Sequence, residues 1–124
     1  MREIKYRAWD KLRKEMINYN RGEFSLMPFS NLYNKQFREV YTFMQYTGLK
    51  DKNGVEIYEG DIVQVEGLGV GIIEYIESYF RIFKPYIFSV NLCNYTSTIE
   101  LEPKNKVEVI GNIYENKDLL SEVK

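Results

Sequence analysis

Hydrophobic and polar residues alternate over several short stretches of this chain, which is the pattern of strands with one buried face. At the N-terminus, a strand is predicted over residues 3–9, with Ile4, Tyr6 and Ala8 on one side and charged residues and a tryptophan on the other. A return strand is expected to begin at Met16 after a turn. The chain therefore opens with a predicted β-hairpin whose loop is longer than two residues.

The next part of the sequence has no single period. Residues 18–36 mix turn-forming and apolar residues, which predicts a loop held against the body, with a short helix capped by Ser30 as the alternative. Residues 38–46 are rich in Val, Tyr, Thr and Phe and predict a strand. The Asn53-Gly54 pair then predicts a chain reversal, because both residue types tolerate positive φ.

From residue 57 to residue 114, short strands with glycine turns between them are expected. The clearest has Tyr86, Phe88, Val90 and Leu92 on one face. Strands are predicted at residues 61–66, 72–77, 79–83, 86–92, 99–102 and 107–110, with turns at residues 67–71 and 103–105. Such spacing is typical of a small barrel or sandwich.

The period changes at the C-terminus. Asn116 is a good N-cap, and Leu119, Leu120 and Val123 share one side of a short helix predicted over residues 117–123. We therefore divide the chain into an N-terminal strand and loop subdomain at residues 1–56, a barrel at residues 57–114 and a helical tail at residues 115–124.

Composition favours β structure and contact surfaces. The 124 residues include 11 Tyr against 7 Phe and 1 Trp, and tyrosine suits strands and half-buried positions. The formal net charge of −1 divides into +3 over residues 1–60 and −4 over residues 61–124. A division of this size is favoured as a mild fluctuation, and the alternative is a weakly dipolar molecule whose ends attract one another in an assembly or meet a charged partner. Neither half has the basic excess of a dedicated duplex binder.

Several motifs together resemble the YopX-like family of small phage and prophage proteins. They are residues 2–10 (REIKYRAWD), residues 44–54 (MQYTGLKDKNG) continuing into residues 56–63 (EIYEGDIV), and residues 108–116 (EVIGNIYEN). The resemblance implies an α+β, mostly β protein, in which an N-terminal β-rich part packs on an SH3-like small β-barrel. It also implies phage or prophage origin and self-assembly in some members, and it implies no known biochemical activity.

Catalytic and metal-binding chemistry finds little support. The chain has no histidine, and Cys93 is the only cysteine, which excludes histidine-based triads and cysteine zinc sites. We expect Cys93 to be a semi-buried packing residue. Glu56, Glu59 and Asp61 could bind Mg²⁺ or Ca²⁺ or divide acid and base roles, but a structural role at a turn is favoured. We expect a non-enzyme without cofactor.

The expected location follows from two of these features. No apolar run approaches the length of a membrane span, and a lone thiol suits a reducing cytoplasm, so we expect a cytoplasmic protein. The family resemblance implies that this is the cytoplasm of a bacterial host cell.

Two function classes remain. One is a self-associating or protein-interaction module, forming a homo-oligomer or binding a host or phage protein. The other is a weak nucleic-acid-binding accessory protein, because cations and aromatic rings that could bind a single strand interleave near the N-terminus. Its candidate contacts are Lys5, Arg7, Trp9, Lys11, Arg13 and Lys14.

Overall fold

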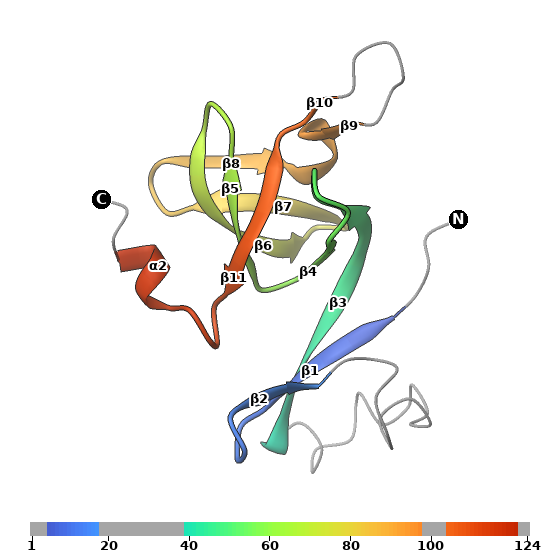
Figure 1. Ribbon diagram of the computed structural model, residues 1–124, viewed down its shortest axis with the longest axis vertical. Helices are drawn as coiled ribbons and strands as arrows, with labels where there is room; N and C mark the ends of the chain where they lie inside the picture. The colour runs from blue at the N-terminus through green and yellow to red at the C-terminus, as the bar shows by residue number, and fades with distance from the viewer. Residues whose placement is uncertain (1–4, 18–38, 98–103, 122–124) are drawn as a thin grey trace. The chain divides into compact units, whose positions relative to one another are not determined.

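The computed structural model describes residues 5–17, 39–97 and 104–121 (Figure 1). The chain forms two compact units, Met1–Tyr46 and Thr47–Lys124. Within the described residues the fold is mostly antiparallel β structure with a short helix near the C-terminus, which confirms the predicted fold class. No helix in these ranges is long and apolar enough to cross a membrane.

The first unit is built on the predicted N-terminal hairpin. Strand β1 (Tyr6–Asp10) pairs with β2 (Glu15–Ile17) on one side and with β3 (Tyr41–Lys50) on the other. Trp9 faces Met16 in β2 and Thr42 in β3. Strand β3 continues into the second unit, so it ends later than predicted. The loop and the alternative helix predicted for residues 18–36 lie outside the described residues.

The second unit contains the predicted small barrel. Its described residues form a five-stranded half-barrel with the strand order β11-β5-β6-β7-β8 (Figure 1). Strand β4 neighbours β3 in the other sheet. The strands are β4 (Glu56–Tyr58), β5 (Asp61–Val65), β6 (Gly69–Ile76), β7 (Tyr79–Lys84), β8 (Phe88–Asn91) and β11 (Val107–Asn112). Shorter elements are η3 (Leu92–Asn94), β9 (Thr96–Ser97), β10 (Lys104–Asn105) and α2 (Asp118–Ser121).

The hydrophobic core lies on the inner face of the half-barrel. Alternate residues of neighbouring strands supply it, including Val63 and Val65 in β5, Ile73 in β6, Ile82 in β7 and Val107 in β11, all essentially inaccessible to solvent. Because side chains alternate between the two faces of a strand, the register fixes which residues enter the core.

The opposite, outer face of the half-barrel is partly covered as well. Ile62 alternates with the core residues of β5 and pairs with Ile72 and Gly111, yet it is fully buried. After β11 the chain turns sharply, and a Cβ atom on Gly111 would lie 2.6 Å from the side-chain oxygen of Asn116. The C-terminal segment therefore folds against the outer face near Ile62.

Some local predictions were wrong. Strand β8 starts only at Phe88, because Lys84 pairs with Phe88 and leaves residues 85–87 as the hairpin connection. Cys93 is exposed in η3, where its thiol lies 2.9 Å from the side-chain oxygen of Asn91, and is not a packing residue. Residues 104–105 form β10 rather than a turn.

Two further predictions concern the last quarter of the chain. Helix α2 begins one residue later than predicted, at Asp118, and residues 122–123 of the predicted helix lie outside the described residues. The Asn116 side chain accepts a hydrogen bond from the Asn112 N–H at 3.1 Å, which ties the turn after β11. The strand predicted at residues 99–102 lies outside the described residues.

Candidate interaction surface

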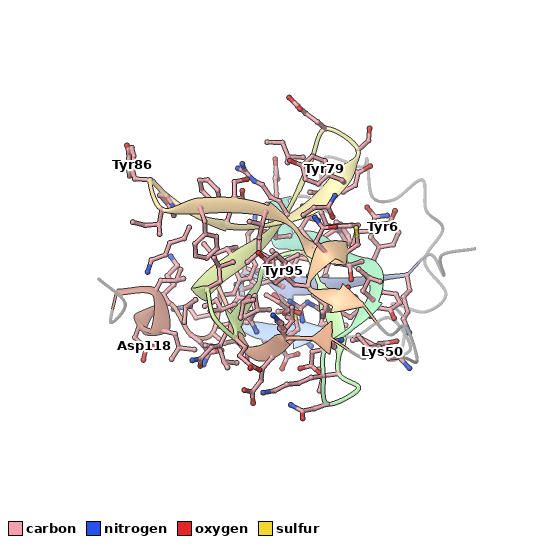
Figure 2. All side chains as sticks on the ribbon, turned by 90° about the horizontal axis from the view of Figure 1, so that it is seen from above. Tyr6, Lys50, Tyr79, Tyr86, Tyr95 and Asp118 are labelled. Atoms are coloured by element: carbon pink, nitrogen blue, oxygen red, sulfur yellow. The ribbon has the colours of Figure 1, made fainter. Side chains whose placement is uncertain are left out.

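Among the described residues of the second unit, the most exposed apolar side chains project from the connection between β7 and β8. We call residues 85–87 the hairpin tip. The Ile87 N–H donates a hydrogen bond to the Lys84 carbonyl at 3.0 Å and closes the turn. Tyr86 is fully exposed, and Ile87 is 66% exposed. In Figure 2 the Tyr86 side chain points away from the sheet.

Tyr86 also has an unusual backbone conformation, with φ of 64°. A left-handed conformation places Cβ close to the neighbouring carbonyl and is uncommon for bulky residues. Pro85 fixes the preceding φ, and the short connection forces the chain to reverse at the next residue. The hairpin tip thus holds an aromatic ring in solvent at a conformational cost.

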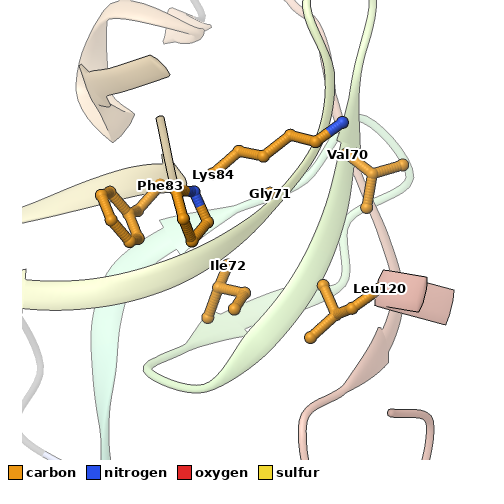
Figure 3. A pocket seen from close by; sticks show the side chains of 7 residues that line it. Val70, Gly71, Ile72, Phe83, Lys84 and Leu120 are labelled. Atoms are coloured by element: carbon orange, nitrogen blue, oxygen red, sulfur yellow. The ribbon is translucent and has the colours of Figure 1, made fainter. Parts of the chain in front are cut away.

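A cavity of about 300 Å³ lies on the outer face of the half-barrel beside the hairpin tip (Figure 3). We call it the outer-face cavity. Strands β6 and β7 form its floor, and α2 and the start of the hairpin tip form its sides. It is lined by Val70, Gly71, Ile72, Phe83, Lys84, Pro85 and Leu120. Among these described residues, Lys84 alone is charged.

Gly71 permits the close packing beneath this cavity. A Cβ atom at this position would lie 2.8 Å from Cγ2 of Ile82 and 3.1 Å from Cε1 of Phe88. The first of these distances is shorter than real Cβ contacts allow. The glycine predicted as part of a turn therefore lies within β6 and serves packing.

A polar ladder continues the outer face beyond the cavity. Arg81 in β7 faces Glu74 in β6, and its Nη2 lies 2.7 Å from Glu74 Oε1. The same guanidinium donates to Ser89 Oγ at 3.2 Å and lies 3.9 Å from the ring centroid of Phe83. Arg81 thus fixes the orientation of an aromatic ring that lines the cavity.

The residues predicted to contact nucleic acid divide into two groups. Arg7 and Trp9 lie on one face of β1 and are half-buried, opposite Met44 and Thr42 of β3. Lys5, just before β1, is also half-buried, and its Nζ lies 4.9 Å from the ring centroid of Tyr46. Alternation therefore brings these three residues to one face of the strand. Because they are half-buried, they do not form an open surface on which bases could stack.

The other three candidates, Lys11, Arg13 and Lys14, are exposed on the loop between β1 and β2. Asp10 shapes this loop, because its Oδ1 accepts hydrogen bonds from the N–H groups of Leu12 and Arg13 at 2.9 and 3.0 Å. The carboxylate also lies 4.0 Å from Nε of Arg13. The loop presents three cations together with the side chain of Leu12, which is 78% exposed.

The carboxylates near the predicted turns bind backbone groups. Asp61 is buried, and its Oδ2 accepts a hydrogen bond from the Tyr58 N–H at 2.8 Å, which supports the structural role expected at this turn. Asp51 is also buried, and its Oδ1 accepts bonds from the N–H groups of Asn53 and Val55. Within the described ranges, no three cysteine or carboxylate residues group closely enough to hold a metal ion.

Sequence reasoning missed the hairpin tip and the outer-face cavity. Tyr86 fitted the apolar stripe of a longer strand, although Pro85 signalled the turn. The cavity joins β6, β7 and α2, which are up to 50 positions apart, so no local pattern indicates it.

Comparisons with known proteins agree with the motifs found in the sequence. The fold is similar to the crystal structure of protein EF1440 from Enterococcus faecalis, with a TM-score of 0.62, 29% sequence identity, and coverage of 97% of this chain and 99% of that chain. No curated protein sequence matches the chain significantly. The family model described as YopX protein matches residues 5–121. Because this match spans nearly the whole chain, the protein belongs to the YopX family.

Proposed function

We propose that this chain is a non-catalytic protein-interaction module that self-associates through the hairpin tip. The observation that carries the proposal is the full exposure of Tyr86 in a left-handed conformation, next to an exposed Ile87. Tyrosine is enriched among the interface residues that dominate binding energy. Small domains also commonly bury leftover apolar surface by association.

The setting of this role follows from family membership and composition. We infer a phage or prophage protein that acts in the bacterial cytoplasm, because its motifs are those of the YopX-like family and its one thiol, Cys93, is exposed. The acidic second half and the basic first half of the chain would favour contacts between copies.

Light scattering on the purified chain tests the proposal. We expect an oligomer at tens of micromolar protein, and we expect the double variant Tyr86→Asn, Ile87→Thr to shift the mass towards the monomer. Leu12→Ser is the matched control, because it removes an exposed apolar side chain from a different hairpin loop. A monomeric wild type at these concentrations contradicts self-association, and an unchanged mass of the double variant contradicts the role of the hairpin tip.

Weak binding of single-stranded nucleic acid is the second candidate function. The observation in its favour is the cluster of exposed cations Lys11, Arg13 and Lys14 on the β1–β2 loop. Binding that relies on phosphate contacts weakens as salt rises, so the triple alanine variant of these residues should lose both affinity and salt dependence. Absence of binding to single-stranded DNA and RNA at about 50 mM salt, where such contacts are strong, rejects this candidate.

A further inference from the structure

The outer-face cavity has the size of a site for one large apolar side chain. Its volume of about 300 Å³ is at the lower end of the range for small-molecule pockets. Ile72 and Leu120 face it from β6 and α2 (Figure 3). An apolar pocket of this size suits a single anchor residue, and a few such anchors often supply most of the binding energy between protein partners.

Lys84 adds a positive charge to the rim of this apolar site. Its side chain extends from β7 towards Val70 in β6 (Figure 3) and makes no hydrogen bond or ion pair within the described part of the chain. Glu74, on the outer face, is already held by Arg81. The ammonium is therefore available to an incoming anion, and the apolar surroundings strengthen such a contact.

We propose that the outer-face cavity binds an acidic-apolar segment of a partner protein. One large apolar side chain of the segment fills the cavity, and an Asp or Glu close to it in sequence pairs with Lys84. Beyond Pro85, the exposed hairpin tip extends the apolar surface past the cavity. A small ligand confined to the cavity would leave the hairpin tip uncovered, whereas a protein segment can cover both. This inference rests on the proposed interaction role and goes beyond self-association, because it gives the interaction surface a second kind of partner.

A random heptapeptide display library, selected in parallel on the full chain and on its variants, tests this proposal. The wild type should enrich peptides with Asp or Glu within two positions of Leu, Ile, Phe, Tyr or Trp. Lys84→Glu should reverse the charge preference to Lys or Arg while keeping the apolar preference. Lys106→Glu, the same charge change at an exposed position in the chain between β10 and β11, should leave the selection unchanged.

Affinities of the enriched consensus peptide complete the test. Fluorescence anisotropy should show a loss of about tenfold or more for Lys84→Glu, as expected when a charge pair becomes a repulsion. Leu120→Ser should also weaken binding without altering the charge preference. No enrichment, enrichment without acidic residues, or identical selection by wild type and Lys84→Glu overturns the proposal. Light scattering on the same samples reports self-association separately, so failure of this inference is distinguishable from failure of the proposed function.

Discussion

The Asp51 carboxylate accepts a hydrogen bond from the backbone N–H of Val109 at 2.9 Å, across 58 positions of sequence. Its other oxygen accepts from the N–H groups of Asn53 and Val55 in the turn before β4. One buried side chain thus shapes a local turn and attaches it to strand β11 of the half-barrel. Such carboxylate bonds to backbone donors are among the stronger hydrogen bonds in proteins.

Replacing Asp51 with Asn should destabilise the protein by about 2 kcal/mol. The amide group must place its NH₂ towards one of the backbone donors, so a buried N–H group loses its acceptor. Urea unfolding measures the change in the free energy of unfolding. Glu66→Gln makes the same carboxylate-to-amide change on the surface and should stay within about 0.5 kcal/mol. Equal effects of both variants would contradict the bridging role of Asp51.

Gly71→Ala should cost about 1–3 kcal/mol, because the added Cβ overlaps Ile82 and lies tightly against Phe88 in a packed region. Gly67→Ala separates steric from conformational effects, since a Cβ there meets no atom within 4 Å but φ is +81°. It should cost about 1 kcal/mol through strain alone.

An asparagine tolerates the left-handed region, so Gly67→Asn should recover part of the loss at Gly67, whereas Gly71→Asn should be worse than Gly71→Ala. Thermal unfolding of the four variants gives this order directly. If Gly71→Asn is more stable than Gly71→Ala, lack of space around Gly71 is not what destabilises the alanine variant.

Arg81 and Glu74 should couple energetically by roughly 0.5–1 kcal/mol in a double-mutant cycle. Two nitrogens of Arg81 lie 2.7 and 3.0 Å from one carboxylate oxygen, and Arg81 is only 19% exposed in its side chain. The comparison pair is Lys52 and Glu108, which are 3.9 Å apart and both more than 40% exposed, and it should couple by less than about 0.5 kcal/mol.

The dependence on salt tests whether the coupling between Arg81 and Glu74 is electrostatic. The coupling of Arg81 with Glu74 should decrease with added NaCl, since part of the Arg81–Glu74 pair is accessible to ions. Arg81→Lys should lose most of the coupling, because an ammonium cannot make the two-nitrogen contact or stack on Phe83 in the same way. If Arg81→Lys has the same free energy of unfolding as the wild type, the contact of Arg81 with the Phe83 ring does not stabilise the protein.

Local sequence patterns predicted much of this fold and little of its candidate surface. Period-2 alternation located β1, and short strands between glycine turns were predicted where β5, β6, β7 and β11 form. The Asn53-Gly54 reversal was also predicted and formed. The sequence pattern predicted the structure correctly where it depended on the conformation of one residue or the burial of one strand.

The remainder depended on contacts between distant residues. The apolar stripe from Tyr86 to Leu92 resembled a long strand, but the register of Lys84 with Phe88 placed Tyr86 in the turn. Ile62 and Ile72 alternate away from the core, and only the return of the C-terminal segment to the outer face places Leu120 beside Ile72, where the cavity lies. A pattern of hydrophobic positions does not say which element covers which face.

The left-handed conformation of Tyr86 links stability and association in opposite directions. Tyr86→Asn should raise Tm by a few degrees, because asparagine adopts a φ of 64° more easily than tyrosine. The same variant should reduce self-association, because it removes the exposed ring of the hairpin tip. Unfolding has to be measured at a protein concentration where the wild type is monomeric, since association itself raises apparent stability.

Ile87→Asn is the matched control for this prediction. It places the same polar side chain one residue later, where φ is not positive, so it should weaken association without raising Tm. If Tyr86→Asn lowers Tm instead, the ring of Tyr86 contributes more to the folded chain than its conformation costs, and the hairpin tip is then a packing element rather than a surface kept exposed for binding.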